Sequence, residues 1–316
     1  MSEEMQGVEG DTGWRKAIPE ARDRLQSRVL VGVVGTILVI ISTLNLMGAF
    51  ARLDRFPATV YGSIGISLVF AIVVWLLKAA TPTGAAYGGM ICFQLTLWTS
   101  PQDGLTGRTA LTPLIALFVL TVMSTRAGKS RKAKAGLAEG KSGRSAAQVI
   151  ANLSVAALCV TPVLIVIIGW MRYGFTSRLA NLLAFAMVKT MCLAALVEAT
   201  ADTVSSEIGQ AFGGDPVLIV GLRRVKPGTD GAVTSLGSIA GIAAGALVAI
   251  AGGWAMHLSA GAMLTALGAG ICGLFFDSFL GATVERRGWI GNDLVNFTST
   301  LFAALLAAAV YRFCIL

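Results

Sequence analysis

The sequence predicts an all-α, polytopic transmembrane helical bundle of about nine spans with a cytoplasmic N-terminus. Three observations support this class. Of the 316 residues, 55% are hydrophobic and only 13% are charged, whereas soluble domains carry about a quarter charged residues. The chain holds 37 glycines but only 8 prolines, a balance typical of closely packed membrane helices. Finally, apolar runs recur along the chain, most of them near the length that a bilayer requires.

Nine apolar runs are predicted to be the spans. They lie near residues 29–50, 57–77, 84–99, 109–124, 148–170, 179–198, 237–257, 260–282 and 295–314. The third and fourth are short for a bilayer that needs about 20 residues, so a tilted or partly re-entrant course is an alternative for them. We therefore expect a cytosolic N-terminal tail, residues 1–28, and a single transmembrane helical domain, residues 29–316, with a basic cytosolic loop over 125–147.

The distribution of basic residues predicts the orientation. With the N-terminus in the cytoplasm, 18 of the 25 Lys and Arg residues fall in the inner segments and six in the outer ones. This bias is the positive-inside signature, and it assigns the 199–236 segment to the cytoplasmic side. The net charge of +8 then reflects topology and anionic lipid headgroups. No nucleic-acid partner is expected, because no basic patch is interleaved with aromatic residues.

The most informative segment is the end of the sixth apolar run, where three carboxylates and two hydroxyls follow one another. Glu198 and Asp202 are four residues apart, so on a helix they share one face, with Ser205 and Ser206 near it. Glu207 completes the set. A carboxylate at a membrane boundary is costly unless it binds a cation or a polar substrate. Such hard oxygen ligands predict a Mg²⁺ site shared with a nucleotide's phosphates.

A glycine-rich, basic segment follows and predicts a phosphate-binding turn. Val217–Val225 is strand-like and indicates a small hairpin at the cytoplasmic face. The turn after it precedes a helix, and its backbone N–H groups can point at one anion. The residues assigned to this site are Arg223, Arg224, Gly228, Thr229, Asp230 and Gly231. An ordinary solvated loop is the alternative, but the neighbouring acidic cluster favours the phosphate site.

Further polar residues lie near the same predicted boundary. Asp277 falls a few residues inside it, where an unpaired carboxylate is disfavoured, so a metal, a cation or a hydroxyl partner is expected. Asn292 and Asn296 begin the ninth run from this side. The proposed active-site region is therefore 198–236 together with 277–296.

Two other features have more than one interpretation. Arg144, Gln148 and Asn152 recur on one helical face, which either contacts a headgroup or bonds neighbouring helices. Lys189 is the only cationic residue well inside a run. It could partner Asp277, contact phosphate as a catalytic residue, or be a snorkelling structural lysine.

A helix with a stripe free of side chains is predicted after the turn. Gly237, Gly241 and Gly245 repeat at every fourth position, so another helix can approach closely along this face. Packing is the favoured interpretation, and substrate contact is the alternative.

Six short segments, in matching order over roughly residues 78–300, carry a family resemblance. They are Thr81–Gly84, Gln148–Asn152, Ala201–Gly209, Gly228–Gly231, Asp277–Ala282 and Asn292–Asn296. Together they resemble the DUF92 family of integral membrane proteins, which includes the plant phytyl-phosphate kinases and their bacterial and animal relatives. The resemblance implies transfer of a phosphoryl group from a nucleotide onto an isoprenoid monophosphate.

The residues and the resemblance together predict a cytoplasm-facing prenyl-phosphate kinase that uses CTP or ATP and Mg²⁺. Asp202 and Glu207, helped by Glu198 and Asp277, would hold the metal. Phytyl or geranylgeranyl phosphate would be the acceptor, with its isoprenoid tail in a groove formed by the glycine-lined helices. The expected partners are this isoprenoid phosphate and membrane lipids, and no sequence feature indicates an oligomeric state.

Two other functions stay open at this point. The first is a transporter or flippase for a lipid or prenyl phosphate, which would use the acidic cluster as a coupling-ion site. The second is a cytidylyltransferase that acts on a lipid phosphate. It would use similar metal ligands but release pyrophosphate.

Overall fold

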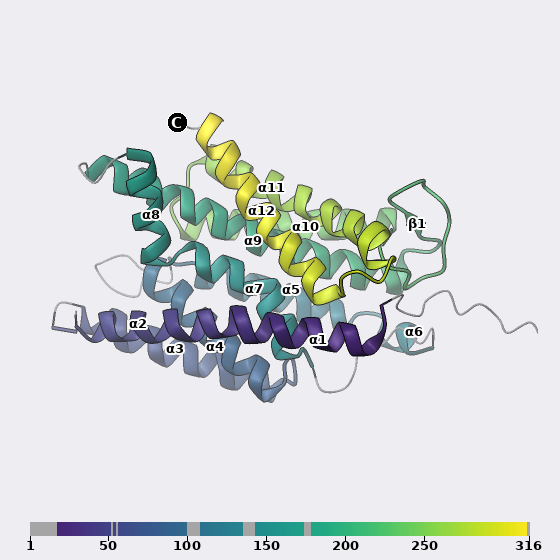
Figure 1. The fold of residues 1–316 in the computed structure, drawn as a ribbon, viewed down its shortest axis with the longest axis horizontal. Coiled ribbons are helices and arrows are strands. Elements are labelled where there is room, and N and C mark those ends of the chain that lie inside the picture. Colours follow the sequence, from purple (N-terminus) through teal and green to yellow (C-terminus); the bar gives the residue numbers. More distant parts are fainter. Residues whose placement is uncertain are drawn as a thin grey trace, which may run out of the picture.

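The computed structural model describes residues 18–51, 53–54, 56–99, 108–134, 143–173 and 178–314. In this part of the chain, most helices run along the long axis of the molecule and pack side by side (Figure 1). Strand β1 and helix α6 lie at one end, and α8 lies at the other (Figure 1). The prediction of an all-α, polytopic membrane protein is confirmed.

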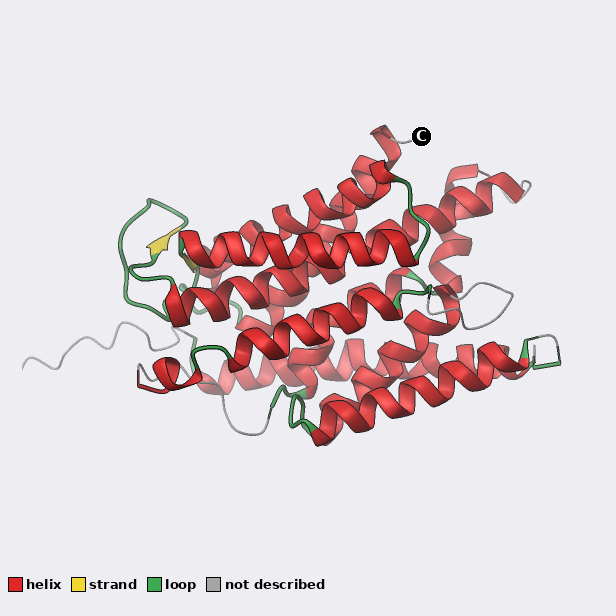
Figure 2. Ribbon diagram, turned by 180° about the vertical axis from the view of Figure 1, so that it is seen from behind, coloured by secondary structure: helices red, strands yellow, loops and turns green. Residues whose placement is uncertain are grey.

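The described elements follow the predicted runs closely. The helices are α1 (Glu20–Leu30), α2 (Thr36–Phe50), α3 (Pro57–Leu76), α4 (Pro82–Thr99), α5 (Leu111–Arg126), α6 (Lys129–Lys134), α7 (Ala146–Cys159), α8 (Pro162–Tyr173), α9 (Arg178–Phe212), α10 (Ser235–Ala255), α11 (Ala260–Leu280) and α12 (Asn292–Cys314), with π-helical turns η1 (Val31–Gly35) and η2 (Gly281–Glu285). Strands β1 (Val217–Leu218) and β2 (Ala232–Val233) pair antiparallel with Val217 opposite Val233. A hairpin is therefore present, but only the first two residues of the predicted Val217–Val225 stretch are strand, and the partner strand lies beyond that stretch. The rest of the described regular structure is helical (Figure 2).

Six of the described helices are long and apolar enough to cross a membrane. They are Glu20–Phe50, Pro57–Leu76, Ala184–Phe212, Ser235–Ala255, Ala260–Glu285 and Asn292–Phe313. Helices α7 and α8 form a pair bent by 53° and would make a seventh span together. Helix α5 is a shorter apolar helix, and α4 is not among the six. The count of nine therefore stays a prediction.

Helix α4 is less apolar because it is enclosed by protein. Gln94 is fully buried, accepts a hydrogen bond from Asn45 and donates one to Ser42 at 3.1 Å. A helix whose polar groups are satisfied by neighbouring helices can lie at membrane depth without a high hydropathy.

The N-terminal segment is helical earlier than the sequence indicates. Helix α1 begins at Glu20, inside the predicted tail, and continues through η1 into α2. Ser27 donates a 2.6 Å hydrogen bond to Asp293, and Gly291 donates one of 2.7 Å to Gln26. These two hydrogen bonds hold α1 against the start of α12, since Ser27 and Gln26 of α1 have their partners there. Residues 1–17 lie outside the described part.

Helix α9 is the central element of the bundle. It packs against α5, α7, α8, α10, α11 and α12. Of its most apolar 18-residue stretch, 78% is buried inside the protein. The acidic residues near its C-terminal half therefore face other helices and not lipid.

The glycine stripe of α10 packs directly on α9. A Cβ atom at position 241 would lie 2.5 Å from the carbonyl oxygen of Ala201, and one at 237 would lie 2.5 Å from that of Ser205. The packing interpretation of the stripe is correct. Within the described residues, the backbone of α9 lies against the stripe at Gly237 and Gly241, so this face of α10 leaves no room for the expected tail groove.

Replacing Gly241 with Leu is expected to lower the stability of the bundle by about 1–3 kcal/mol or more, since an added side chain overpacks the α9–α10 contact. Thermal unfolding in detergent and the yield of monodisperse protein measure the effect. Gly268→Leu is the matched control, because a Cβ atom there meets nothing within 4 Å. Equal melting of the two variants would contradict the close contact.

Candidate functional site

A polar cavity of about 310 Å³ lies at the end of the bundle that carries the β-hairpin. Its walls come from α7, α9, the 216–234 segment, the end of α11 with η2, and the start of α12. Most of its lining side chains are polar. Small-molecule sites commonly occupy about 300–1,000 Å³, so the cavity has the size of a ligand site.

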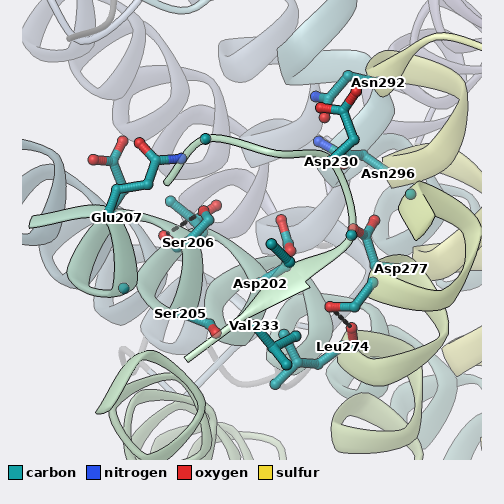
Figure 3. A pocket seen from close by; sticks show the side chains of 18 of the residues that line it. Asp202, Ser205, Ser206, Glu207, Asp230, Val233, Leu274, Asp277, Asn292 and Asn296 are labelled. Carbon is teal, nitrogen blue, oxygen red and sulfur yellow. Dashed lines mark hydrogen bonds between the residues drawn. The ribbon is translucent and has the colours of Figure 1, made fainter. Parts of the chain in front are cut away.

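Helix α9 supplies one wall of this cavity. Asp202, Ser205, Ser206 and Glu207 all line it, as their spacing predicts. Asp202 lies near the middle of the group, whereas Glu207 lies at its edge (Figure 3). The helical period thus places this part of the sequence cluster on one cavity wall.

The opposite wall is built by the last two helices. Asp277 comes from α11, and Asn292 and Asn296 come from the first turns of α12. Asn292 and Asn296 are one helical turn apart, so both side chains share the cavity face. Figure 3 shows them beside Asp230, with Asp277 facing the same space as Asp202.

Two carboxylates that line the cavity, Asp202 and Asp277, form a group with a third, Glu198, that does not line it. Glu198 is only 1% exposed, and it lies close enough to Asp202 and Asp277 for their charges to interact. Ser299 donates a 3.0 Å hydrogen bond to Asp277. The Oε1 atom of Glu198 is buried without a hydrogen-bond partner among the described residues. Unpaired buried carboxylates are costly, so this group favours binding of a cation.

Arg144 supplies positive charge to this group. Its guanidinium interacts favourably with Asp202 and donates a hydrogen bond of 3.4 Å to the Thr203 hydroxyl. Its backbone is held on both sides, because Arg144 N–H donates to the Ala79 carbonyl and Thr81 N–H donates to the Arg144 carbonyl, each at 2.9 Å. Its contact with Thr203 of α9 agrees with bonding between neighbouring helices, whereas contact of this polar face with a headgroup stays a prediction.

Two glycines, Gly84 and Gly143, allow the backbone of Arg144 to lie close to the 79–81 turn and form these hydrogen bonds. A Cβ atom at Gly84 would lie 2.8 Å from the Arg144 carbonyl oxygen. Gly143, with a φ of +74°, has a backbone conformation that other residues rarely adopt and lies against the 78–80 backbone. The two glycines let the start of α7 approach the turn before α4 and fix the position of Arg144.

The Gly228–Gly231 turn covers the cavity, and all four of its residues line it. Gly231 has a φ of +71°, and a Cβ atom there would overlap the backbone of Ala282. A Cβ atom at Gly281 would lie 2.7 Å from the Gly231 nitrogen. Two facing glycines therefore dock the turn on the end of α11. Thr234 then caps α10, with its hydroxyl accepting a 3.1 Å hydrogen bond from Gly237 N–H.

Glu207 forms a buried ion pair that the sequence does not reveal. Lys132 of α6, 3% exposed, donates to Glu207, which is 7% exposed. The Thr125 hydroxyl donates to Glu207 at 3.1 Å, and Lys132 also donates to the Thr125 carbonyl at 2.9 Å. Because its charge is already paired, we do not assign Glu207 to a metal.

Replacing Lys132 with Met is expected to destabilise the protein by about 3–5 kcal/mol, because it leaves the Glu207 carboxylate buried and unpaired. Thermal unfolding measures the loss. Lys129→Met on the same helix is the control, since Lys129 is exposed. The double variant Lys132→Met/Glu207→Leu should recover most of the loss, and equal melting of K132M and K129M would contradict the buried pair.

Three residues assigned to the site by sequence lie elsewhere. The Lys189 ammonium donates a 2.8 Å hydrogen bond to the carbonyl of Met256 at the far end of α10, where a cation satisfies a helix C-terminus. Its assignment as a catalytic residue is therefore corrected to a structural one. Arg223 and Arg224 are exposed and do not line the cavity, and Arg224 lies 3.6 Å from Asp215 at the surface.

Some cavity residues were missed by the sequence analysis. Glu285, 4% exposed, and Gln210 both line the cavity. Glu285 precedes Arg286 and Arg287 and so resembles part of a charged surface loop in the sequence. Its eight-residue spacing from Asp277, two helical turns, is the signal that places it on the same face.

The residues of this cavity fit a metal that is shared with a nucleotide. Among the described residues, no group of three or more His, Cys, Asp or Glu side chains is arranged to hold a metal by itself. Mg²⁺ at nucleotide sites usually takes only one or two carboxylates, with phosphates and waters as its other ligands. Asp202 and Asp277 could supply this donor set, and Glu198, whose Oε1 is unsatisfied, lies close enough for its charge to interact with both.

Fold and site together define a polytopic α-helical membrane protein with an acid-lined polar cavity at one end of its bundle. Residues 65–304 match the family described as integral membrane protein DUF92. The chain therefore belongs to the DUF92 family, as its motifs indicate. The matched region contains every residue that lines the cavity.

Similar proteins come from archaea, cyanobacteria and plants. An uncharacterised membrane protein of Methanocaldococcus jannaschii is 33% identical over 119 residues, covering 38% of this chain and 50% of that protein. One from Synechocystis is 30% identical over 184 residues, covering 56% and 64%. Protein VTE6, chloroplastic, of Arabidopsis thaliana is 25% identical over 181 residues, covering 56% and 51%. The chain thus spans less than two thirds of each relative. No solved structure matches it.

Proposed function

We propose that this protein is a membrane-embedded kinase that transfers a phosphoryl group from CTP or ATP to a prenyl-alcohol monophosphate. The main support is the single cavity that combines Asp202 and Asp277 with the Gly228–Gly231 turn. The family resemblance to plant phytyl-phosphate kinases supports the class of reaction. The 25% identity with Protein VTE6, chloroplastic, shows that the chain has a relative in a plant, as this resemblance requires.

The reaction needs little covalent help from the protein. An oxygen of the acceptor phosphate attacks the γ-phosphorus of the donor, and the bond from that phosphorus to the bridging oxygen of the β-phosphate breaks. Prenyl diphosphate and nucleoside diphosphate are the products. Because the acceptor is ionised near neutral pH, no strong general base is required. Positioning and charge neutralisation are the main demands of phosphoryl transfer.

Each part of the cavity has a proposed role. Asp202 and Asp277 would hold Mg²⁺, which when bound supplies positive charge to the donor phosphates, and Glu198 would support it from below. The N–H groups of the Gly228–Gly231 turn would bind phosphate oxygens. Arg144 would offset the charge of the acceptor phosphate.

The polar side chains that complete the cavity are proposed to contact the donor. They are Asn152, Ser205, Ser206, Thr229, Asn292 and Asn296. Asp230 lies in the turn and lines the cavity, and a cation between its carboxylate and the donor phosphates would offset their repulsion.

One assay with two labels tests the reaction. Purified protein in lipid nanodiscs is incubated with geranylgeranyl or phytyl monophosphate, Mg²⁺, and CTP or ATP labelled in the α- or γ-phosphate. Transfer of γ-label alone to a prenyl diphosphate is the expected result. Transfer of α-label to the lipid with release of pyrophosphate would instead show a cytidylyltransferase. Absence of product together with movement of prenyl phosphate across a liposome bilayer would show a transporter.

The cavity is proposed to face the cytoplasm, because the basic residues favour that side for the 199–236 segment. Inside-out membrane vesicles should therefore use added nucleotide. If only right-side-out vesicles turned over added nucleotide, the cavity would face the opposite side of the membrane and the proposed orientation would be wrong.

A further inference from the structure

A second cavity, of about 440 Å³, adjoins the polar one. It lies between α3, α4, α5 and α7. Arg144 and Asn152 line both cavities. The two spaces therefore meet at Arg144, whose backbone is fixed by the hydrogen bonds to the 79–81 turn described above.

One part of the second cavity is lined by apolar side chains. Its apolar lining comes from three helices: Phe70 and Val74 of α3, Leu117 and Phe118 of α5, and Leu153 of α7. The rings of Phe70 and Phe118 meet edge to face with centroids 5.6 Å apart. This part of the cavity can accommodate a hydrocarbon chain but offers little to a polar ligand.

The other part of the second cavity is basic. Lys78 follows α3, Arg126 ends α5, Lys129 begins α6, and Arg144 precedes α7. Lys132 also lies there, but its charge is paired with Glu207. The helix ends that supply these cations belong to the same end of the bundle as the polar cavity. One basic region beside an apolar chamber is complementary to a single-chain lipid with an anionic head.

We propose that this second cavity binds the prenyl monophosphate acceptor, with its apolar chain among Phe70, Leu117 and Phe118 and its phosphate at Arg144. The proposal rests on the proposed kinase function and adds the location of the acceptor. The acceptor phosphate then lies at the junction with the polar cavity, where the donor phosphates bind. It replaces the groove expected along the glycine stripe of α10.

Gly88 of α4 allows a direct test, because it lines the second cavity and a Cβ atom there meets only Phe70 at an ordinary 3.7 Å. Gly88→Leu should therefore fold but fill the chamber. Binding of labelled geranylgeranyl monophosphate to protein in nanodiscs, without nucleotide, should weaken at least about tenfold, the smallest effect typical of one misplaced group in an apolar pocket. Nucleotide binding should not change.

Gly65→Leu is the matched control for this variant. Gly65 lies on α3, is exposed, and has nothing within 4 Å of its Cβ position. It adds the same side chain outside the cavity. Equal acceptor binding by G88L and G65L would overturn the assignment. Gly88→Ala, which fits the available space, should retain binding. If the leucine variant fails to fold, the α6 variants below test the assignment.

The basic region is tested by a second pair of variants on α6. Lys129→Gln should weaken binding of the monophosphate but not that of geranylgeraniol. Arg131→Gln should change neither, because Arg131 lies over the Phe212 ring, 5.1 Å from its centroid, and does not line the cavity. Equal effects of K129Q and R131Q would overturn the placement of the phosphate.

Competitors identify the occupant. Phytyl monophosphate should displace the label, whereas inorganic phosphate should not. Displacement by phosphatidic acid at equal concentration would assign the cavity to a phospholipid and overturn the proposal. If binding follows these expectations but no phosphoryl transfer occurs, the kinase proposal fails while the location of the lipid stands. Normal transfer with unaffected binding in G88L overturns the location alone.

Discussion

Replacing Asp202 with Asn is expected to reduce prenyl-phosphate phosphorylation by more than about 10²-fold, the scale of a lost electrostatic contact in a phosphoryl-transfer site. Asp202 lines the cavity, interacts with Glu198 and Asp277, and has Arg144 as its favourable partner. The amide keeps the shape of the side chain but removes the negative charge proposed to bind Mg²⁺. Initial rates over a Mg²⁺ titration measure the loss.

Asp215→Asn is the control for this experiment. Asp215 is also an acid of the 199–236 segment, but it is exposed and lies 3.6 Å from Arg224 at the surface. Its substitution should leave turnover unchanged. Thermal unfolding of both variants separates lost chemistry from lost folding. Near-normal turnover by D202N would remove Asp202 from the metal role.

Replacing Arg144 with Gln is expected to give the second largest loss of turnover, about 10²-fold, because one cation at a transferring phosphate contributes on that scale. Arg144 is shared by both cavities, so KM for the prenyl phosphate should rise while kcat falls. Only its side chain is altered, because the hydrogen bonds of its backbone to Ala79 and Thr81 remain. Steady-state kinetics with each substrate varied separately measure both effects.

Arg144→Lys distinguishes geometry from charge. A lysine keeps the charge but lacks the planar group that can contact two oxygens at once, so only partial activity should return. Arg131→Gln, outside both cavities, should have normal kinetics. A variant R144Q with unchanged KM and kcat would exclude the proposed place of the acceptor phosphate.

Much of the candidate site could be predicted from local spacing. Asp202, Ser205 and Ser206 fall on one wall because a helix repeats every 3.6 residues. Asp277 and Asn292 could be added because burial of polar groups near one membrane boundary requires partners. The structure brings all five into one cavity, and their roles as ligands stay predictions.

Other features could not be found from spacing. Glu207 looks like Asp202 in the sequence, yet its charge is paired with Lys132 of α6, from the segment predicted to be a basic cytosolic loop. Lys189 lies nine residues before Glu198, which is about 13 Å along a helix at 1.5 Å per residue. Its partner is the end of α10, a helix that begins far away in the sequence.

The sequence by itself determined that this protein is a multi-pass helical membrane protein, that its polar motifs gather near one boundary, and that α10 packs closely through glycine. These properties follow from composition and helical period, which act within one segment. Only the tertiary structure decided which charges are paired and that two cavities meet at Arg144. Charge pairing and cavities depend on which face of each helix points to which neighbour. That orientation is set by packing between segments distant in the chain, such as the contact of Gly237 and Gly241 with α9.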